Sequence, residues 1–271
     1  MIGLNVFMEN FKEYLKRMYK ARYFLVHLVR WDVKFKFRRS VLGLLWTILQ
    51  PLLLTAIIAF VFSYIFKQDI KTYAPYILSG ILVWDIISAA VIGNGGSFMQ
   101  AESYIKQFSH PIIIYPIRAA LVSIINFVIA SLGLIIWTVF VYPQNIVIAV
   151  VSIPLTSIIY FVAAWSISII SSHLYVRYRD YPYVMSLVMQ FLWYLSPVFF
   201  KEEMFLSNDL LHTFFLVNPI THFLLLIREP FLNGYFANAE SYVYCAGVSL
   251  LLLIAAWSVN KKYEKSVIYY L

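Results

Sequence analysis

Residues 119–176, AALVSIINFVIASLGLIIWTVFVYPQNIVIAVVSIPLTSIIYFVAAWSISIISSHLYV, contain no Asp, Glu, Lys or Arg. A helix needs about 20 apolar residues to cross a membrane, so this stretch is long enough for two crossings. The tetrapeptide Tyr142-Pro143-Gln144-Asn145 interrupts it near the middle, and such residues are typical of turns. We therefore predict two membrane-spanning helices, over residues 117–141 and 146–172.

The whole chain has the composition of an integral membrane protein. Of its 271 residues, 62% are hydrophobic and only 13% are charged, and the mean hydropathy is +0.78. A typical soluble domain has about 25% charged residues. This composition excludes a soluble enzyme and a disordered chain. A disulfide scaffold is excluded as well, because Cys245 is the only cysteine.

Four further apolar stretches predict an all-α protein with six spans. They cover residues 41–66, 73–99, 181–200 and 241–260. A seventh candidate, residues 210–227, is interrupted by Asn218-Pro219, and each half would form only about 13 Å of helix. We predict an outer re-entrant helix pair over residues 205–232, and a kinked seventh span is the alternative.

The positive charges support six spans with both termini inside. On that topology 17 Lys and Arg lie inside and 4 lie outside, which is a strong positive-inside bias. The inside set is Lys12, Lys16, Arg17, Lys20, Arg22, Arg30, Lys34, Lys36, Arg38, Arg39, Lys106, Arg118, Arg177, Arg179, Lys261, Lys262 and Lys265. The outside set is Lys67, Lys71, Lys201 and Arg228.

A basic and aromatic segment over residues 1–40 precedes the membrane domain, which covers residues 41–271. Apolar residues near its end recur at helical spacing, with basic residues on another face, so we predict an amphipathic helix in the inner headgroup layer. Strict alternation over residues 33–38 leaves a short strand open. The candidates for a rim that binds a lipid phosphate or pyrophosphate are Arg30, Lys34, Arg38 and Arg39. A plain topological anchor is the alternative.

Two short polar loops are predicted on the inner face. The loop over residues 100–110 suits a brief helix presented to a cytosolic partner, and an ordinary connecting loop is the alternative. Its candidate contact residues are Glu102, Tyr104, Lys106 and His110. Arg179 and Asp180 precede the fifth span and are interpreted as a pair at the membrane edge or as a solvated turn.

A few residues within the spans are candidates for a transport path. Asp85 is the only acid inside a predicted span, where a charge costs at least a few kcal/mol. We interpret it as a coupling group or as a residue beside a water-filled path. Sugar rings stack on aromatic faces, which makes Trp46, Phe60, Phe191 and Trp193 candidates for lining a glycan path. For each of these aromatics, contact with lipid or with another helix is the alternative.

Nucleotide-binding and metal-binding motifs are absent from the sequence. It contains no G-x-x-x-x-G-K-[ST] loop, no His-Glu-x-x-His and no Cys/His cluster. We therefore expect no ATP hydrolysis, no metal and no cofactor in this chain. The net charge of +8 fits inner loops beside anionic lipid and does not require nucleic acid.

A set of short motifs runs in order through residues 30–230. They are Asp32-Val-Lys-Phe-Lys-Phe-Arg-Arg-Ser-Val-Leu-Gly43, Leu45-Trp46, Gln50-Pro51, Gly80 with Trp84, Tyr178-Arg179-Asp180, Ser196-Pro197-Val198 and Asn218-Pro219. Together with six spans, this ordered set resembles the membrane subunits of ABC-2-type polysaccharide exporters, which move O-antigen, teichoic acid or capsule. Asp85 directly follows Trp84, where the family pattern leads us to expect an uncharged residue.

The resemblance implies a homodimer in the bacterial cytoplasmic membrane, also called the inner membrane, with both termini in the cytoplasm. Two copies of a cytosolic ABC ATPase would bind ATP and Mg. Residues 100–110 correspond to the coupling helix that docks on the ATPase, and the segment before the first span corresponds to an interfacial gate helix. Residues 205–217 and 219–232 correspond to outer gate helices, with Asn218 and Pro219 at their junction. Six helices alone are too few to enclose a sugar chain, which agrees with two copies.

The predicted function is that of a permease subunit for a lipid-linked polysaccharide. A permease of the same class for a drug or a non-glycan lipid is the alternative. A secondary transporter would usually show internal repeats and several intramembrane ionisable groups, and only Asp85 is present. A membrane transferase would need a cluster of acids or histidines at one membrane face.

Overall fold

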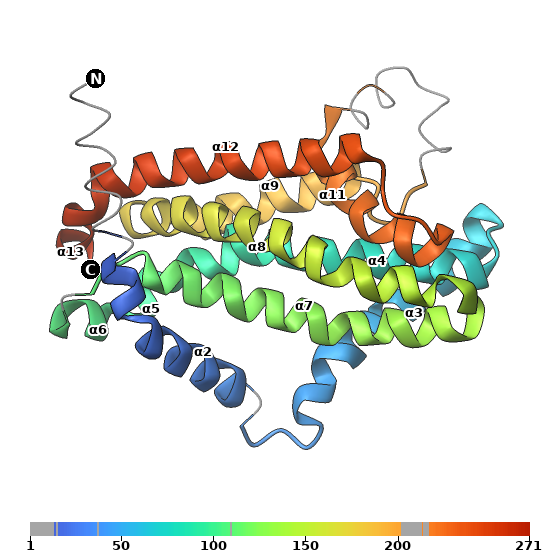
Figure 1. Cartoon of the computed structure of the whole chain (residues 1–271), viewed down its shortest axis with the longest axis horizontal. Coiled ribbons are helices and arrows are strands. Elements are labelled where there is room, and N and C mark those ends of the chain that lie inside the picture. The colour runs from blue at the N-terminus through green and yellow to red at the C-terminus, as the bar shows by residue number, and fades with distance from the viewer. Residues whose placement is uncertain (1–13, 15, 37, 109, 202–212, 214–216) are drawn as a thin grey trace.

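The chain folds into a bundle of long helices that lie side by side (Figure 1). The computed structural model describes residues 14, 16–36, 38–108, 110–201, 213 and 217–271. Every regular element among these residues is a helix, so the all-α prediction is confirmed for this part of the chain. Two short helices, α6 (Glu102–Gln107) and α13 (Val267–Tyr270), lie at the same end of the bundle, called here the α6 end.

Five helical segments are long and apolar enough to cross a membrane. They are Gly43–Ile65, Ile70–Gln100, Ile114–Val141, Pro143–Arg177 and Ala239–Tyr270. The α-helices that form them are α3 (Trp46–Phe66), α4 (Ile70–Ser88), α7 (Ile114–Val141), α8 (Ile146–Arg177) and α12 (Ala239–Tyr263). Each coincides with a predicted span, although the last one runs on to Tyr270 instead of ending at residue 260.

The remaining predicted span, residues 181–200, contains a shorter helix. The helix α9 (Tyr181–Leu195) has 15 residues and is therefore about 22 Å long, less than the roughly 30 Å hydrocarbon core of a bilayer. It ends because Ser196, which precedes Pro197, has an extended conformation (φ −100°, ψ 149°). The count of six spans therefore stays a prediction.

The second span bends where its sequence is rich in glycine. After α4 the chain passes through a π turn, a 3-10 turn and α5, over Ala89–Gly93, Asn94–Gly96 and Ser97–Gln100. The Asn94 amide donates to the hydroxyl of Ser123 at 3.3 Å and to that of Ser168 at 3.1 Å. These bonds join the bend to α7 and α8, so the bend is a fixed part of the bundle.

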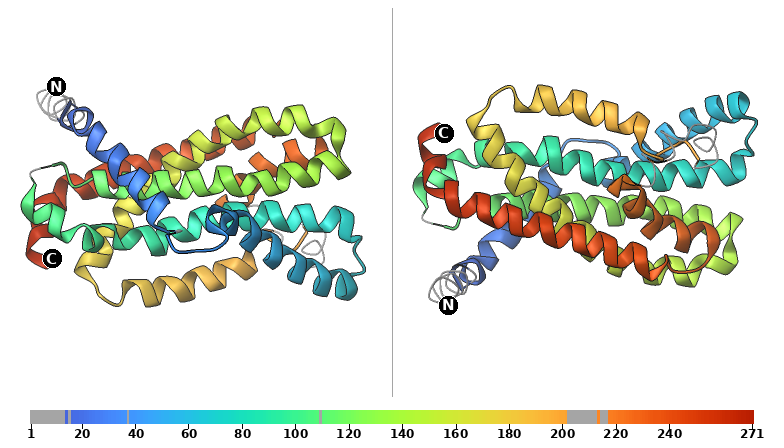
Figure 2. Two further views of the ribbon diagram at one scale, coloured as in Figure 1. Left: turned by 90° about the horizontal axis from the view of Figure 1, so that it is seen from below. Right: turned by 90° about the horizontal axis from the view of Figure 1, so that it is seen from above.

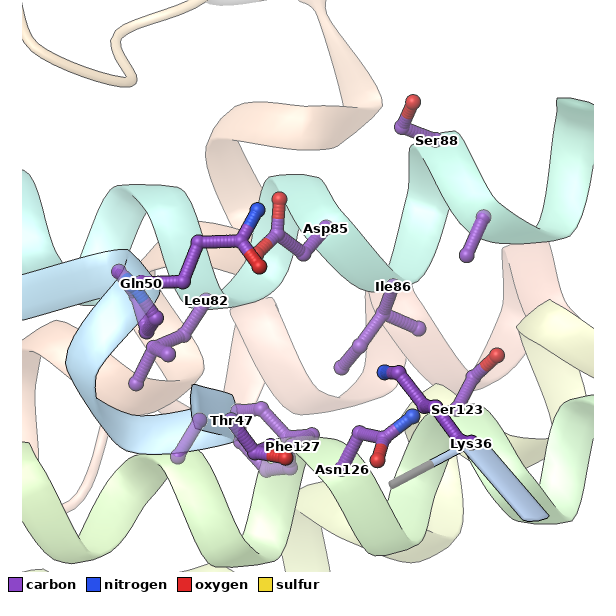
Figure 3. Close-up of a pocket in the computed structure, with 13 residues that line it drawn as sticks. Lys36, Thr47, Gln50, Leu82, Asp85, Ile86, Ser88, Ser123, Asn126 and Phe127 are labelled. Atoms are coloured by element: carbon purple, nitrogen blue, oxygen red, sulfur yellow. The ribbon is translucent and has the colours of Figure 1, made fainter. Parts of the chain in front are cut away.

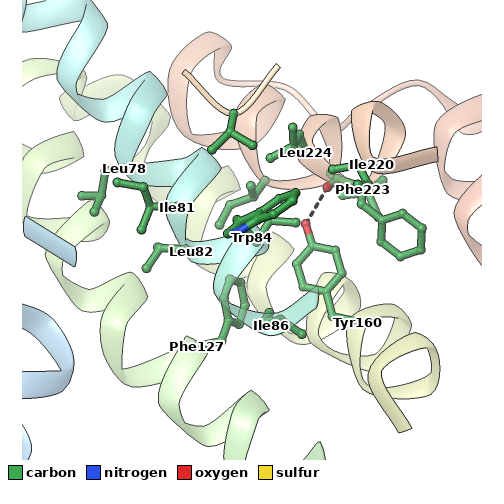
Figure 4. Packing of buried hydrophobic residues seen from close by; sticks show 14 of the residues in the cluster. Leu78, Ile81, Leu82, Trp84, Ile86, Phe127, Tyr160, Ile220, Phe223 and Leu224 are labelled. Atoms are coloured by element: carbon green, nitrogen blue, oxygen red, sulfur yellow. Dashed lines mark hydrogen bonds between the residues drawn. The ribbon is translucent and has the colours of Figure 1, made fainter. Parts of the chain in front are cut away.

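The core forms around α4, which is the most enclosed of the five long segments. Figure 4 shows Leu78, Ile81 and Ile86 of α4 packed among side chains from α7, α8 and α11. Tyr160 is fully buried there, and its hydroxyl donates to the backbone carbonyl of Phe223 at 2.7 Å. Since lipid offers no hydrogen-bonding partner, this buried hydroxyl must be satisfied within the protein.

The helix α11 (Pro219–Arg228) begins at the predicted break. The Asn218 side chain accepts a hydrogen bond from the backbone N–H of Ile220 at 3.0 Å, and Pro219 occupies the first turn, where its missing N–H has no consequence. A π turn over Glu229–Asn233 follows. In the predicted outer pair, residues 205–212 and 214–216 lie outside the described residues, so only its second half is seen as a helix.

Arg228 is a buried cation at the end of α11, with 6% of its surface exposed. Its guanidinium donates to the carbonyls of Val198 at 2.8 Å and Tyr76 at 3.3 Å, and lies 3.6 Å from the centre of the Tyr76 ring. From the sequence Arg228 was interpreted only as an outer positive charge. In the structure its side chain joins α11 to α4 and to the turn that follows α9.

Gly80 lies at the closest approach between α4 and this turn. A Cβ there would collide with the Val198 carbonyl and lie 2.9 Å from the Arg228 guanidinium. We expect Gly80→Ala to lower the free energy of unfolding by about 1–3 kcal/mol, because neither group has room to move. The melting temperature in detergent measures this effect. Gly93→Ala is the matched control, because a Cβ at Gly93 meets no atom within 4 Å. Equal melting temperatures for the two variants would contradict the prediction.

Candidate functional site

The helix α2 (Arg22–Lys36) precedes the first span and crosses the bundle surface toward the start of α3 (Figure 2). The predicted helix is thus confirmed, and helical geometry as far as Lys36 excludes a strand there. Leu28 and Val29 are buried against the bundle. Trp31 and Phe35 are more than half exposed and stack on each other with ring centres 5.9 Å apart. The helix therefore has one face on the bundle and one aromatic face outside it.

A bidentate ion pair fixes α2 to α7. Arg118 donates through both Nε and Nη2 to the two carboxylate oxygens of Asp32. Their side chains are 16% and 25% exposed, so the pair is largely shielded from solvent. Bidentate arginine–carboxylate pairs are among the stronger polar contacts in proteins, and this one determines where α2 lies on the bundle.

The four residues predicted as a cationic rim are exposed. Arg30 and Lys34 lie on α2, one helical turn apart, while Arg38 and Arg39 lie in the turn between α2 and α3. Arg39 has a left-handed backbone conformation with φ +69°, which turns the chain toward α3. The structure thus places these side chains along the path from α2 to the first span.

The predicted inner loop contains the short helix α6, as expected. An ion pair of 2.6 Å between Lys106 and Glu102 spans one turn of this helix, and both side chains are substantially exposed. Phe24 of α2 packs against Tyr104 and His110, with ring centres 5.9 and 4.9 Å apart. The helix α6 therefore carries exposed charges and is in direct contact with α2.

At the same end of the bundle, Tyr14 joins the N-terminal region to α12 and the turn that follows it. Its hydroxyl donates to Glu264 at 2.9 Å and accepts from the Asn260 amide at 3.3 Å. Burial and the neighbouring Glu264 charge raise the pKa of Tyr14 well above its usual value, so the hydroxyl keeps its proton and remains a donor.

Asp85 lines a polar pocket of about 270 Å³ at the junction of α2 and α3 (Figure 3). The pocket is lined by the end of α2 and by parts of α3, α4 and α7. Figure 3 shows Gln50 pointing toward Asp85, while Lys36, Ser123 and Asn126 gather on the other side of the space. The lone acid of the spans therefore has polar neighbours from three other helices.

Asp85 stands out in the sequence as a lone acid, whereas its polar neighbours were not predicted from it. Polar residues occur as i, i+3 pairs in three mainly apolar helices, and that spacing places each pair on one helix face. The pairs are Thr47 with Gln50, Asp85 with Ser88, and Ser123 with Asn126. This signal is present in the sequence, but which helix faces meet depends on packing.

The four predicted path aromatics divide into two groups. Trp46, Phe60 and Phe191 are 44%, 60% and 65% exposed, and they lie on α3 and α9, which run along the same flank of the bundle (Figure 2). Trp193 instead packs edge-on against Trp84 with ring centres 5.0 Å apart. Trp193 therefore contacts another helix inside the bundle, and contact with another helix was the alternative given for this residue.

The predicted membrane-edge residues Arg179 and Asp180 are exposed just before α9. No ion pair joins them among the residues that the structure describes. The Asp180 backbone carbonyl accepts the N–H groups of Tyr183 and Val184 at 3.1 Å, so this residue opens α9. Within the described ranges, no group of three or more His, Cys, Asp or Glu side chains is placed to hold a metal ion.

The five long apolar helical segments make this chain a multi-pass helical membrane protein. It is similar to the O-antigen export system permease protein RfbA of Myxococcus xanthus, with 24% identity over 90% of this chain and 94% of the relative. Two RfbA permeases of Klebsiella pneumoniae are 27% and 26% identical over 92% and 84% of this chain and over 97% and 88% of their own lengths. No protein-family model matches the sequence. These relatives support the predicted resemblance to membrane subunits of ABC-2-type polysaccharide exporters.

The ion pair between Asp32 and Arg118 yields a prediction about α2. Asp32→Asn leaves the Arg118 charge without its carboxylate, and we expect a lower melting temperature and faster proteolysis near α2. The swap of Asp32→Arg with Arg118→Asp should restore most of the loss. We expect a coupling energy of about 1–2 kcal/mol in a double-mutant cycle. A coupling energy near zero would show that the pair does not fix α2.

Proposed function

We propose that this chain is the permease subunit of an ATP-driven exporter of a lipid-linked polysaccharide. The observation that carries the proposal is the similarity to three O-antigen export permeases over most of the chain, in a protein with five helical segments long and apolar enough to cross a membrane. The sequence has no phosphate-binding loop, so a separate ATPase subunit would bind ATP and Mg and supply the energy.

We propose that the α6 end of the bundle faces the cytoplasm. The excess of Lys and Arg on that side supports this orientation, and α9 would then serve as a short fifth crossing. The exposed α6 is suited to contact the ATPase, and its packing on α2 would pass a movement from the ATPase to the start of the first span.

We propose that two copies of the chain meet along the flank formed by α3 and α9. Both helices expose many apolar side chains there, including Ile57, Tyr64 and Leu187. A path between two such flanks would be lined by Trp46, Phe60 and Phe191, and their rings would offer flat faces to sugar rings.

The exposed rim of Arg30, Lys34, Arg38 and Arg39 is proposed to hold the phosphate groups of the lipid carrier. These residues lie where the first span begins, and a lipid phosphate lies at the same depth as that end of the span. Each basic residue near an anionic surface contributes about 1 kcal/mol, and a bidentate Arg contact to phosphate adds to this.

Surface polysaccharide in the bacterial host tests this function. Removal of the chain, with the ATPase and glycosyltransferases intact, should leave lipid-linked glycan inside the cell and none at the surface. The combination of Arg38→Gln with Arg39→Gln should reduce surface glycan several-fold at normal expression. Lys262→Gln with Lys265→Gln is the matched control, because it removes the same charge from exposed residues away from the rim. Normal surface glycan without the chain would refute the function, and a normal level in the rim variant alone would refute the rim.

A charge swap tests docking through α6. Glu102→Lys with Lys106→Glu keeps an ion pair within the helix but reverses the charges that a partner meets. We expect several-fold weaker co-purification of the ATPase at an unchanged melting temperature, because the i, i+4 pair itself contributes only about 0.2–0.5 kcal/mol. If co-purification of the ATPase were undiminished, Glu102 and Lys106 would not be part of the docking surface.

A further inference from the structure

The pocket around Asp85 is polar in a region where polar groups are costly. Its polar lining residues are Lys36, Thr47, Gln50, Asp85, Ser88, Ser123 and Asn126. Six of them belong to segments that are long and apolar enough to cross a membrane. A polar group transferred to an apolar environment without a partner costs at least about 1–3 kcal/mol, so such a cluster requires a physical reason.

Two buried atoms of this lining have no partner. The Asn126 Oδ1 and the Thr47 Oγ1 make no hydrogen bond with any residue that the structure describes. Ser123 on the same wall is different, because its hydroxyl donates to the Ala119 carbonyl at 3.1 Å and accepts from the Asn94 amide at 3.3 Å. The pocket therefore holds unused hydrogen-bonding capacity on two of its walls.

The two charges of the lining have opposite sign. The side chains of Lys36 and Asp85 border the same space. A phosphate inside the pocket would be repelled by the carboxylate, whereas the exposed arginines at the α2–α3 turn carry positive charge only. A neutral group with many donors and acceptors fits this lining better than an anion does.

We propose that this pocket binds a single sugar ring, the one attached directly to the lipid phosphate. The proposal rests on the proposed export of a lipid-linked polysaccharide. A carboxylate can accept from two neighbouring hydroxyls, and the amides of Gln50 and Asn126 can both donate and accept. The Lys36 ammonium donates, and Phe127 adds an apolar wall for the C–H face of the ring. The volume of about 270 Å³ lies at the low end for small-molecule sites, which suits one ring.

This placement divides recognition of the carrier between two neighbouring surfaces. Arg38 follows Lys36 by two residues, so the rim and the pocket are adjacent along the chain. Phosphates held at the rim would leave the first sugar within reach of the pocket. The pocket would then distinguish a loaded carrier from an empty one.

Binding to the full chain in lipid nanodiscs tests the proposal. The probes are a short synthetic polyprenyl pyrophosphate and the same lipid carrying one hexose. The wild type should bind the hexose-bearing lipid about tenfold more tightly than the bare one. Asp85→Asn, Asn126→Leu and Thr47→Val should each reduce this preference while the affinity for the bare lipid stays unchanged, which also reports correct folding. Gln144→Leu in the turn between α7 and α8 is the control, because Gln144 is an exposed amide that does not line the pocket.

Four other binding results would contradict the pocket proposal or the proposed function. Equal affinity of the wild type for the two lipids would overturn the pocket proposal and leave the rim and the export function standing. A preference that survives in all three pocket variants would also overturn it, because the sugar would then bind elsewhere. Binding of phosphatidylethanolamine that is lost in Asp85→Asn, without a sugar preference, would assign the pocket to a structural lipid. Binding of neither pyrophosphate lipid would contradict the proposed function itself.

Discussion

Three backbone carbonyls in the turn after α9 each receive a hydrogen bond from a side chain of another helix. Arg228 donates to Val198 at 2.8 Å, Tyr73 donates to Phe199 at 2.7 Å, and Tyr76 donates to Phe200 at 2.8 Å. Val198 and Phe199 are buried away from water, and buried backbone carbonyls need donors from the protein. The short length of α9 therefore depends on two tyrosines of α4 and one arginine of α11.

This constraint explains why α4 has so central a place. Its tyrosines satisfy the turn, its Gly80 leaves room for the Val198 carbonyl and the Arg228 guanidinium, and its apolar side chains form much of the core. The bend after α4 follows the same rule, because Asn94 is held by hydroxyls of α7 and α8. Ten buried side-chain atoms among the described residues have no hydrogen-bonding partner, and two of them, on Thr47 and Asn126, line the pocket at Asp85. The pocket differs from those other places in its space of about 270 Å³ and its polar lining, which is why we propose a ligand there.

Much of this fold could be predicted from the sequence, because length and apolarity determine which segments can cross a membrane. Residues 119–176 give a helical hairpin, and Asn218-Pro219 marks the start of a helix, as predicted. The early end of α9 was missed although Pro197 is a local signal for it, because residues 181–200 carry no charge and the donors that satisfy the turn come from distant helices. Arg228 was missed for a related reason, since a single arginine near a loop is usually solvated.

The candidate site shows the same limit of local reasoning. The basic residues before the first span and the short inner helix were found because charge and helical spacing are local signals. The partners of Asp85 were missed because their meeting depends on the rotation of three helices about their axes. The separation of Trp193 from the exposed aromatics likewise depends on its contact with Trp84. Thus the sequence indicates which residues are unusual, and packing decides which of them act together.

The central claim is that this chain moves a lipid-linked glycan across the membrane with energy from a separate ATPase. Proteoliposomes that contain the chain, its ATPase partner and a lipid-linked glycan in the outer leaflet test it directly, because glycan that has crossed becomes protected from an added glycosidase. We predict ATP-dependent protection that requires both proteins and is absent with either one alone. Protection that develops without ATP, or none with both proteins and ATP present, would contradict the account.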